Sequence, residues 1–135
     1  MNIGRFLLTA SAALAALAAP AAAKPDYAGD IKADYDKSLG ALWDHFHRNP
    51  ELSFREFKTA ARMAQELRAI PGMVVTEKVG QTGVVGVFKN GEGPVVLVRA
   101  DMDGLPVQER SGYANASTVR QVGVDGLEMP VMHAC

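Results

Sequence analysis

Two aspartates, Asp101 and Asp103, are the first residues whose types and spacing could support chemistry. They come directly after Val95–Val98, a run that is apolar on both faces and therefore predicts a strand buried centrally in a sheet. Ligands of α/β sheets tend to bind at the carboxyl ends of strands. If the extended backbone continued, both carboxylates would point the same way and could bind a hard cation or support the ligands of a zinc ion. The alternative is a polar loop in which the aspartates cap turns.

A second candidate is the segment Met132–Cys135, because His133 and Cys135 are residue types that bind zinc. Two such residues within four positions are a weak signal, and a chance pairing or a buried structural cysteine are the alternatives. Cys135 is the single cysteine, so it cannot close a disulfide within the chain. It is a free thiol, an intermolecular partner or a metal ligand.

Two histidines and three glycines have simpler interpretations. His45 and His47 lie two positions apart near the end of a predicted helix, so they do not share a face and make a poor metal pair. We expect them to be solvated or to interact with the last carbonyls of that helix. Gly80, Gly83 and Gly86 lie between and within predicted strands, which favours turns and bulges over a nucleotide-binding loop.

Two helices precede these candidate residues. Apolar residues at steps of three and four predict a helix over about residues 30–47, and Asn49-Pro50 ends it; its expected buried face is Ile31, Tyr35, Leu39, Leu42 and Phe46. Ser53 and Glu56 form a capping-box pattern that predicts the start of a second helix, which Pro71-Gly72 stops. Its expected stripe is Phe57, Ala60, Ala61, Ala64 and Leu67, and the expected core at the helix junction is Trp43, Phe46, Phe54 and Phe57.

Strands follow the helices. Met73–Val79 and Gly83–Lys89 are β-rich, Asn90-Gly91 marks a turn, and Val95–Val98 is the third strand. Residues 105–130 hold few periodic apolar stretches and predict a loop with short elements. The order of helices and strands predicts an α/β fold with helices packed on a mixed β-sheet.

The composition and the N-terminal residues indicate which partners and which cellular location to expect. The net charge is −1 and no basic run occurs, which gives no reason to expect nucleic acid or an anionic membrane as a partner. Residues 1–23 combine Arg5, an apolar stretch over Phe6–Ala19 and a small-residue end at Ala21-Ala22-Ala23. This pattern predicts a cleaved signal peptide and export to the periplasm or medium, with the mature chain starting after Ala23. A membrane anchor is the alternative, but the run is short and rich in alanine, so no stable anchor is expected.

Four segments, in order, resemble a known family: His47–Phe54 (HRNPELSF), Thr82–Val85 (TGVV), Arg99–Glu109 (RADMDGLPVQE) and Met132–Cys135 (MHAC). The family is the aminoacylase and carboxypeptidase group of dinuclear metallohydrolases. The branch it resembles contains hippurate hydrolase, N-acetyl-diaminopimelate deacetylase and the indole-acetyl-amino-acid hydrolases. The resemblance covers about residues 39–135. Gly104 departs from the alanine usual in the family, and the stretch 115–130 differs from the usual spacing.

The resemblance implies site residues. Cys135 would bind metal as a thiolate, while Asp101 and Asp103 would support the metal ligands. His133 would not be the ligand histidine of the motif. Two divalent ions, zinc or manganese, would polarise an amide carbonyl and hold the attacking water. The substrate would be an N-acyl amino acid or a small peptide-like amide.

The resemblance also implies that residues 24–135 are the truncated N-terminal portion of a zinc-peptidase-like catalytic domain. The general-base glutamate would lie beyond the end, the inserted dimerisation domain would be absent, and a homodimer would belong to the complete protein. We expect the chain alone to be inactive. Two alternatives remain: an inactive fragment that acts at most as a binding or interaction module, and a different hydrolase that uses the aspartate pair without the cysteine site.

Overall fold

The computed structural model describes residues 25–134, so the predicted signal peptide and Cys135 lie outside the described residues. The described chain begins with one long helix in three parts: α1 (Tyr27–Asp34), the π-helical turn η1 (Tyr35–Leu39) and α2 (Gly40–Arg48). Asp26 caps it by accepting a hydrogen bond from the Gly29 N–H (3.1 Å). The helix predicted over residues 30–47 is confirmed, with an earlier start.

The burial predicted for this helix is wrong over its first half. Ile31, Tyr35 and Leu39 are exposed, and only Leu42 and Phe46 are half-buried. Within the described residues α1 contacts chiefly its own continuation η1, so its apolar face has nothing to pack against. None of the described helices is long and apolar enough to cross a membrane.

The second helix, α3 (Phe57–Arg68), starts later than its predicted capping box. Its N-cap residue is Glu56, whose side chain makes no capping hydrogen bond. The cap comes instead from Glu51, whose Oε2 accepts the Thr59 N–H at 2.7 Å. The proposed Ser53–Glu56 capping box is therefore wrong, because a turn at Leu52–Arg55 precedes the helix and a carboxylate from before that turn satisfies its first amides.

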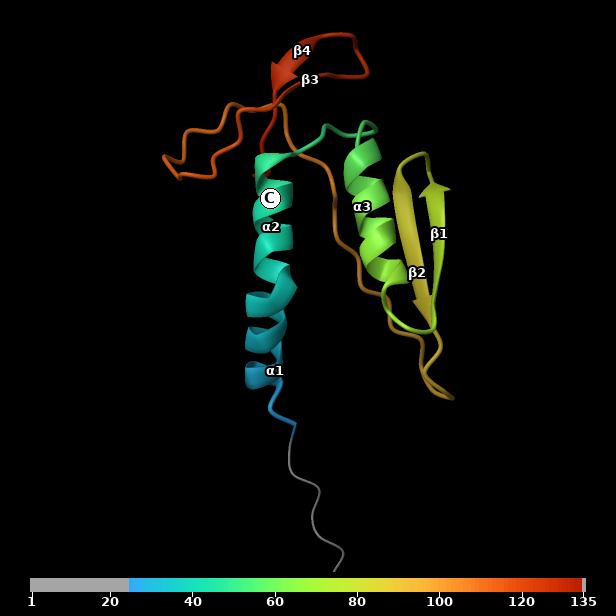
Figure 1. Cartoon of the computed structure of the whole chain (residues 1–135). Helices are drawn as coiled ribbons and strands as arrows, with labels where there is room; N and C mark the ends of the chain where they lie inside the picture. The colour runs from blue at the N-terminus through green and yellow to red at the C-terminus, as the bar shows by residue number, and fades with distance from the viewer. Residues whose placement is uncertain (1–24, 135) are drawn as a thin grey trace, which may run out of the picture.

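An antiparallel hairpin of β1 (Met73–Val79) and β2 (Gly83–Phe88) covers one face of α3, as Figure 1 shows on the right. Both strands agree with the predicted ranges. Gly86 lies where the helix approaches the sheet, since a Cβ there would meet the Leu67 methyl carbons at 3.4 Å. Of the stripe predicted for α3, Ala60, Ala64 and Leu67 are buried or half-buried, while Phe57 and Ala61 are exposed.

The third predicted strand is not formed. Val95–Val98 has no strand partner among the described residues, and its four side chains are 98%, 81%, 84% and 91% exposed. A strand buried centrally needs a hydrogen-bonded neighbour on each side, and the hairpin offers none to this segment. After β2, the chain instead runs back behind α3 toward the N-terminal end of that helix (Figure 1).

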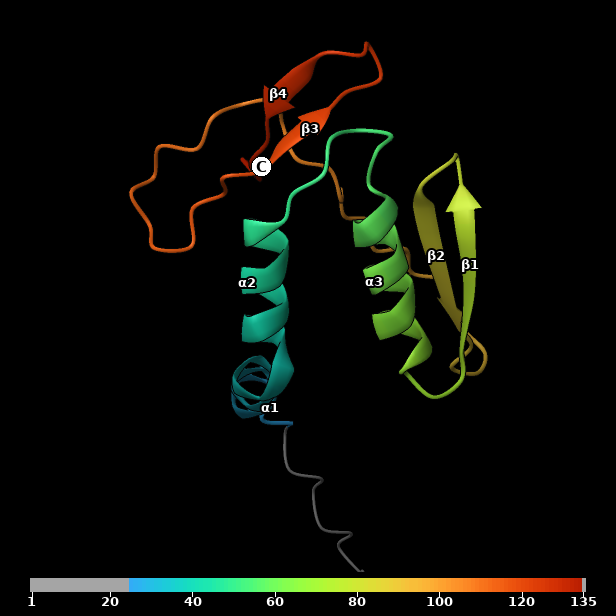
Figure 2. The same ribbon diagram turned by 45° about the horizontal axis from the view of Figure 1, so that its top comes forward.

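The short elements predicted in residues 105–130 are a second antiparallel hairpin, β3 (Arg120–Val122) and β4 (Glu128–Pro130). It lies beyond the C-terminal end of α2, which Figure 2 shows from a second angle. The architecture is α/β as predicted. The mixed sheet is wrong, because the described residues form two separate two-stranded antiparallel sheets.

Close packing joins three segments that are distant in sequence. Leu52 forms a parallel bridge with Gly104, and Leu105 forms an antiparallel bridge with Met132. Val131 and Pro50 are fully buried beside them. A Cβ on Gly104 would lie 2.8 Å from Val131 Cγ1 and 3.0 Å from Pro50 Cβ, so glycine allows this close approach. We call these three segments (residues 50–52, 104–105 and 131–132) the junction.

The aromatic core predicted between the helices is largely wrong. Trp43, Phe54 and Phe57 are exposed, and Phe46 is half-buried. The small buried core consists of Pro50, Leu52 and Val131 of the junction together with Ala60 and Ala64 of α3.

Candidate functional site

The two predicted aspartates lie in different surroundings. Asp101 is exposed and its Oδ1 accepts a hydrogen bond from Arg99 Nη2 at 2.6 Å, forming an ion pair. Asp103 is half-buried beside the junction. In the described chain Arg99 engages Asp101, and that both carboxylates serve one site stays a prediction. Their roles as supports for metal ligands, and that of Cys135 as a ligand, stay predictions.

His133 lies next to Asp103. Burial is the main cause that lowers the pKa of His133, and the charge of His47 acts in the same direction. Hydrogen bonding to the Asp103 backbone and the carboxylate charge of Asp103 oppose the shift. The Nε2 atom of His133 is buried and has no hydrogen-bond partner among the described residues. Burial and the charge of His47 therefore disfavour the protonated form of this ring.

A metal ion needs about three protein ligands. Within residues 25–134, no group of three His, Cys, Asp or Glu side chains is arranged to hold one. The described residues alone therefore do not fit a metal ion, and Cys135, the predicted ligand, lies outside them.

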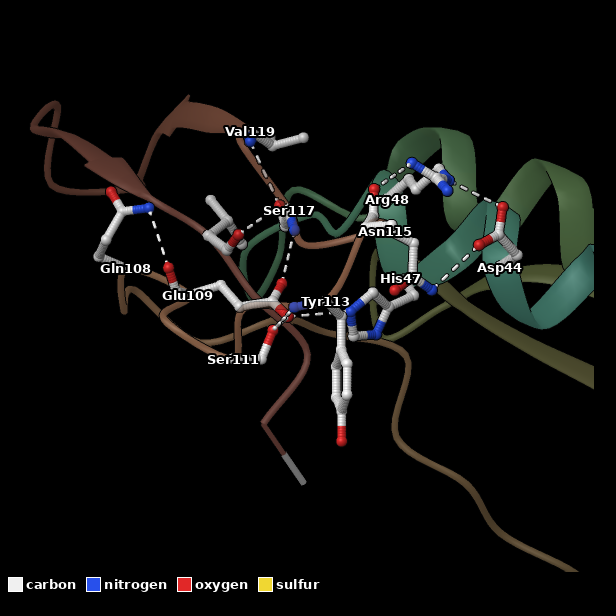
Figure 3. Close-up of polar contacts among 12 residues, drawn as sticks. Asp44, His47, Arg48, Gln108, Glu109, Ser111, Tyr113, Asn115, Ser117 and Val119 are labelled. Carbon is white, nitrogen blue, oxygen red and sulfur yellow. Dashed lines mark hydrogen bonds and ion pairs between the residues drawn. The ribbon is translucent and has the colours of Figure 1, made fainter.

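The most fully bonded polar group is the carboxylate of Glu109 (Figure 3), whose side chain is 1% exposed. Its Oε1 lies 3.1 Å from His47 Nε2 and accepts the Ser111 hydroxyl at 2.5 Å. Its Oε2 accepts the backbone N–H of Ser117 at 2.5 Å. His47, 15% exposed in its side chain, also stacks on Trp43. We call Glu109, His47, Ser111 and Ser117 the Glu109 cluster.

Hydrogen bonds lower the pKa of Glu109. The Ser111 hydroxyl contributes most, followed by the Ser117 N–H, while burial opposes them and His47 adds to them. The Glu109 carboxylate lies between Ser111 and His47. In a catalytic triad the histidine contacts the serine directly, so these three residues are not arranged as a triad. The cluster instead fastens the loop that follows Arg99–Glu109 to the end of α2.

Neighbouring contacts extend this attachment. Asp44 of α2 accepts hydrogen bonds from Arg48 at 2.8 Å and from Asn115 at 3.0 Å, and these two bonds lower the pKa of Asp44. The Ser117 hydroxyl donates to the Val131 carbonyl at 2.7 Å. One chain of contacts therefore connects α2, the loop and the segment that leads into Met132–Cys135 (Figure 3).

The sequence patterns do not predict this cluster. The prediction that His47 is solvated or near the helix carbonyls is wrong, because the ring faces the buried carboxylate of Glu109. His45 is exposed, and its carbonyl accepts the Asn49 side chain at 2.7 Å. The usable signal was that His47 begins one motif segment of the family resemblance and Glu109 ends another.

An open pocket of about 390 Å³ lies on the side of the junction that Asp103 lines. One wall is Leu52-Ser53 and Asp103–Pro106, and the other wall comes from the β3–β4 hairpin. Pro106 and Leu105 are exposed at this surface, while Met129 is half-buried.

Known proteins share this stretch of sequence. The chain is 38% identical to a hippurate hydrolase of Campylobacter jejuni over 107 residues, which are 78% of this chain and 24% of that protein. It is 44% identical over 91 residues to thermostable carboxypeptidase 2 of Saccharolobus solfataricus, covering 66% of this chain and 21% of that protein. It is 38% identical over 91 residues to an N-acetyldiaminopimelate deacetylase of Bacillus cytotoxicus, and the match covers 66% of this chain and 22% of that protein.

These matches cover most of this chain but only a small part of each relative. The chain spans about a fifth to a quarter of the length of the curated relatives it matches. No family model matches the chain. No solved structure matches it either. Through these curated relatives, the chain is a partial homologue within the aminoacylase and carboxypeptidase family of hydrolases.

Proposed function

We propose that this chain is part of a metal-dependent amidohydrolase that cleaves N-acyl amino acids or small peptide-like amides. Two divalent ions, zinc or manganese, would supply an activated water and polarise the amide carbonyl. Cys135 would be a metal ligand, and Asp101 and Asp103 would support the ligands. The relatives that support this proposal include a hippurate hydrolase, an amidohydrolase and an N-acetyl-L-cysteine deacetylase by name.

The observation that carries the proposal is the meeting of motif segments. Three of the four segments that resemble the family converge although 44 residues (55–98) and 22 residues (110–131) separate them in the sequence. Leu52 bridges Gly104, Leu105 bridges Met132, and His47 contacts Glu109. Residues that carry a family's chemistry are held by such packed scaffolds. The convergence supports a shared role for these segments.

We further propose export, with cleavage after Ala23, from the charge and apolar pattern of residues 1–23. N-terminal sequencing of the exported protein should begin at Lys24. Recovery of the intact N-terminus outside the cytoplasm would rule out cleavage there.

A chimera tests the function. Residues 24–135 would replace the homologous stretch of the Campylobacter hippurate hydrolase, and metal-dependent hydrolysis of hippurate and N-acetyl amino acids would be measured. We expect activity that chelation removes and that Cys135→Ala removes. A folded, metal-loaded chimera without turnover of either substrate class would contradict the proposal.

The second candidate function is an inactive binding or interaction module. It is favoured by the exposed run Val95–Val98, because contiguous exposed apolar surface marks an interaction site. The 135-residue chain, supplied with zinc or manganese, separates the two. We expect no turnover from it alone, and turnover above a Cys135→Ala control would show that it assembles a site by itself.

A further inference from the structure

The pocket beside Asp103 combines apolar walls with negative charge. Its apolar lining comes from Leu52, Leu105, Pro106, Val124 and Met129. Its volume of about 390 Å³ is in the range of small-molecule sites, which are usually apolar with a few polar groups that orient the ligand.

The charged residues that line the pocket are both acidic. Asp103 belongs to the wall from the motif segment, and Asp125 belongs to the β3–β4 hairpin. Asp125 Oδ1 already accepts the Leu127 N–H at 3.0 Å, which fixes the turn and leaves its second oxygen available. Arg55 contacts the hairpin wall through the Gly123 carbonyl at 3.5 Å and offsets part of this charge, leaving carboxylates in excess.

The second wall belongs to the β3–β4 hairpin, which supplies Gly123, Val124, Asp125 and Met129. Loops and hairpins carried on a scaffold commonly set ligand preference. The pocket therefore combines a wall from two motif segments with a wall from this hairpin.

We propose that this pocket binds an apolar group that ends in a cation, such as an alkylammonium side chain of the substrate. The apolar walls would cover the methylene chain, and the carboxylates would favour the ammonium. A carboxylate on the same apolar chain is repelled. The role as a substrate subsite rests on the proposed amidohydrolase function, but binding does not depend on hydrolysis.

The test titrates the full chain with hexylammonium and with hexanoate, following the methyl NMR signals of Met129, Leu52 and Val124. We expect hexylammonium to shift these signals with at least about tenfold tighter binding than hexanoate. Equal binding of the two probes, tighter binding of hexanoate, or no binding of hexylammonium would overturn the proposal.

Two variants locate the effect. Asp125→Asn keeps an oxygen for the Leu127 N–H, and we expect it to weaken hexylammonium binding about fivefold, as for one partly exposed charge pair. Gly123→Ala places a methyl 2.9 Å from Asp125 Oδ1 and 3.4 Å from Met129 Cε, so it crowds the carboxylate and the apolar wall and should reduce binding of both probes. Glu92→Gln, an exposed carboxylate in the turn 90–93, is the matched control and should leave the binding of both probes unchanged.

Unchanged hexylammonium binding in a folded Asp125→Asn protein would show that the probe does not bind in this pocket. If the probe binds but the chimera hydrolyses nothing, only the proposed function fails.

Discussion

At the residue scale, the Glu109 carboxylate has hydrogen-bond partners on both of its oxygens. Glu109 accepts hydrogen bonds from Ser111 and Ser117 and contacts His47, while Asp101 is exposed and paired with Arg99. Residue types predicted the aspartates as candidates because carboxylates after an apolar run are visible in sequence. The partners of Glu109 come from positions up to 62 residues away, so spacing could not reveal them.

The pH dependence of stability follows from the lowered pKa of Glu109. Ionised Glu109 stabilises the fold fully above the ordinary glutamate pKa of 4.5, and this stabilisation is lost as pH falls through the lower folded value. We expect Glu109→Gln to lower the Tm by at least about 4 °C at pH 7, and by less as the pH drops below about 4.5. Thermal melts followed by circular dichroism measure both. A Tm difference that does not shrink in acid, or that Glu92→Gln reproduces, would contradict this assignment.

Asp103 is the other residue that yields a prediction. In the chimera, we expect Asp103→Ala to reduce metal affinity or activity about 10- to 100-fold, as for a carboxylate that orients a metal ligand. Metal titration and steady-state rates measure the two effects. A folded variant that matches the parent in both would leave Asp103 as a residue of the pocket wall alone.

At the element scale, local patterns predicted helix and strand positions well and burial poorly. The helix steps and the β-rich runs gave the two helices and the hairpin, because backbone preference is local. Val95–Val98 was misjudged because a buried strand depends on neighbours that the pattern itself does not contain. The capping box failed for a related reason, since Ser53 lies in a turn and the capping carboxylate comes from Glu51.

The cap of α3 can be tested directly. Glu51→Ala leaves the Thr59 N–H without its acceptor, and we expect a loss of about 1–2 kcal/mol in the free energy of unfolding. Glu51→Gln keeps an oxygen acceptor and should lose less. Urea denaturation measures the three proteins. If Ser53→Ala lowers the free energy of unfolding as much as Glu51→Ala does, the capping box predicted from the sequence would be correct.

At the scale of the whole molecule, the described chain buries little apolar surface around a small core. Tyr27, Ile31 and Trp43 are exposed along the long helix, as are the four residues of Val95–Val98. Surfaces of this kind bind dyes and self-associate because burying apolar area is favourable. The isolated chain should therefore bind the dye ANS strongly and sediment as concentration-dependent oligomers.

A matched pair of variants checks this expectation. Val96→Lys places a charge in the exposed apolar run and should shift sedimentation toward the monomer, because burying a charge between chains is unfavourable. Lys89→Arg changes an exposed residue without changing its charge and should have no effect. A chain that is monomeric at all concentrations and does not bind ANS would show that these side chains are covered in solution.

In the proposed amidohydrolase, Cys135 of this segment would contribute a thiolate to the metal site. The most direct measurement is the absorption spectrum of the chimera loaded with cobalt(II), because a thiolate bound to cobalt gives an intense near-ultraviolet charge-transfer band and imidazole or carboxylate ligands do not. We predict that the band is present in the chimera and absent in its Cys135→Ser variant. An identical spectrum in the two proteins would contradict the account.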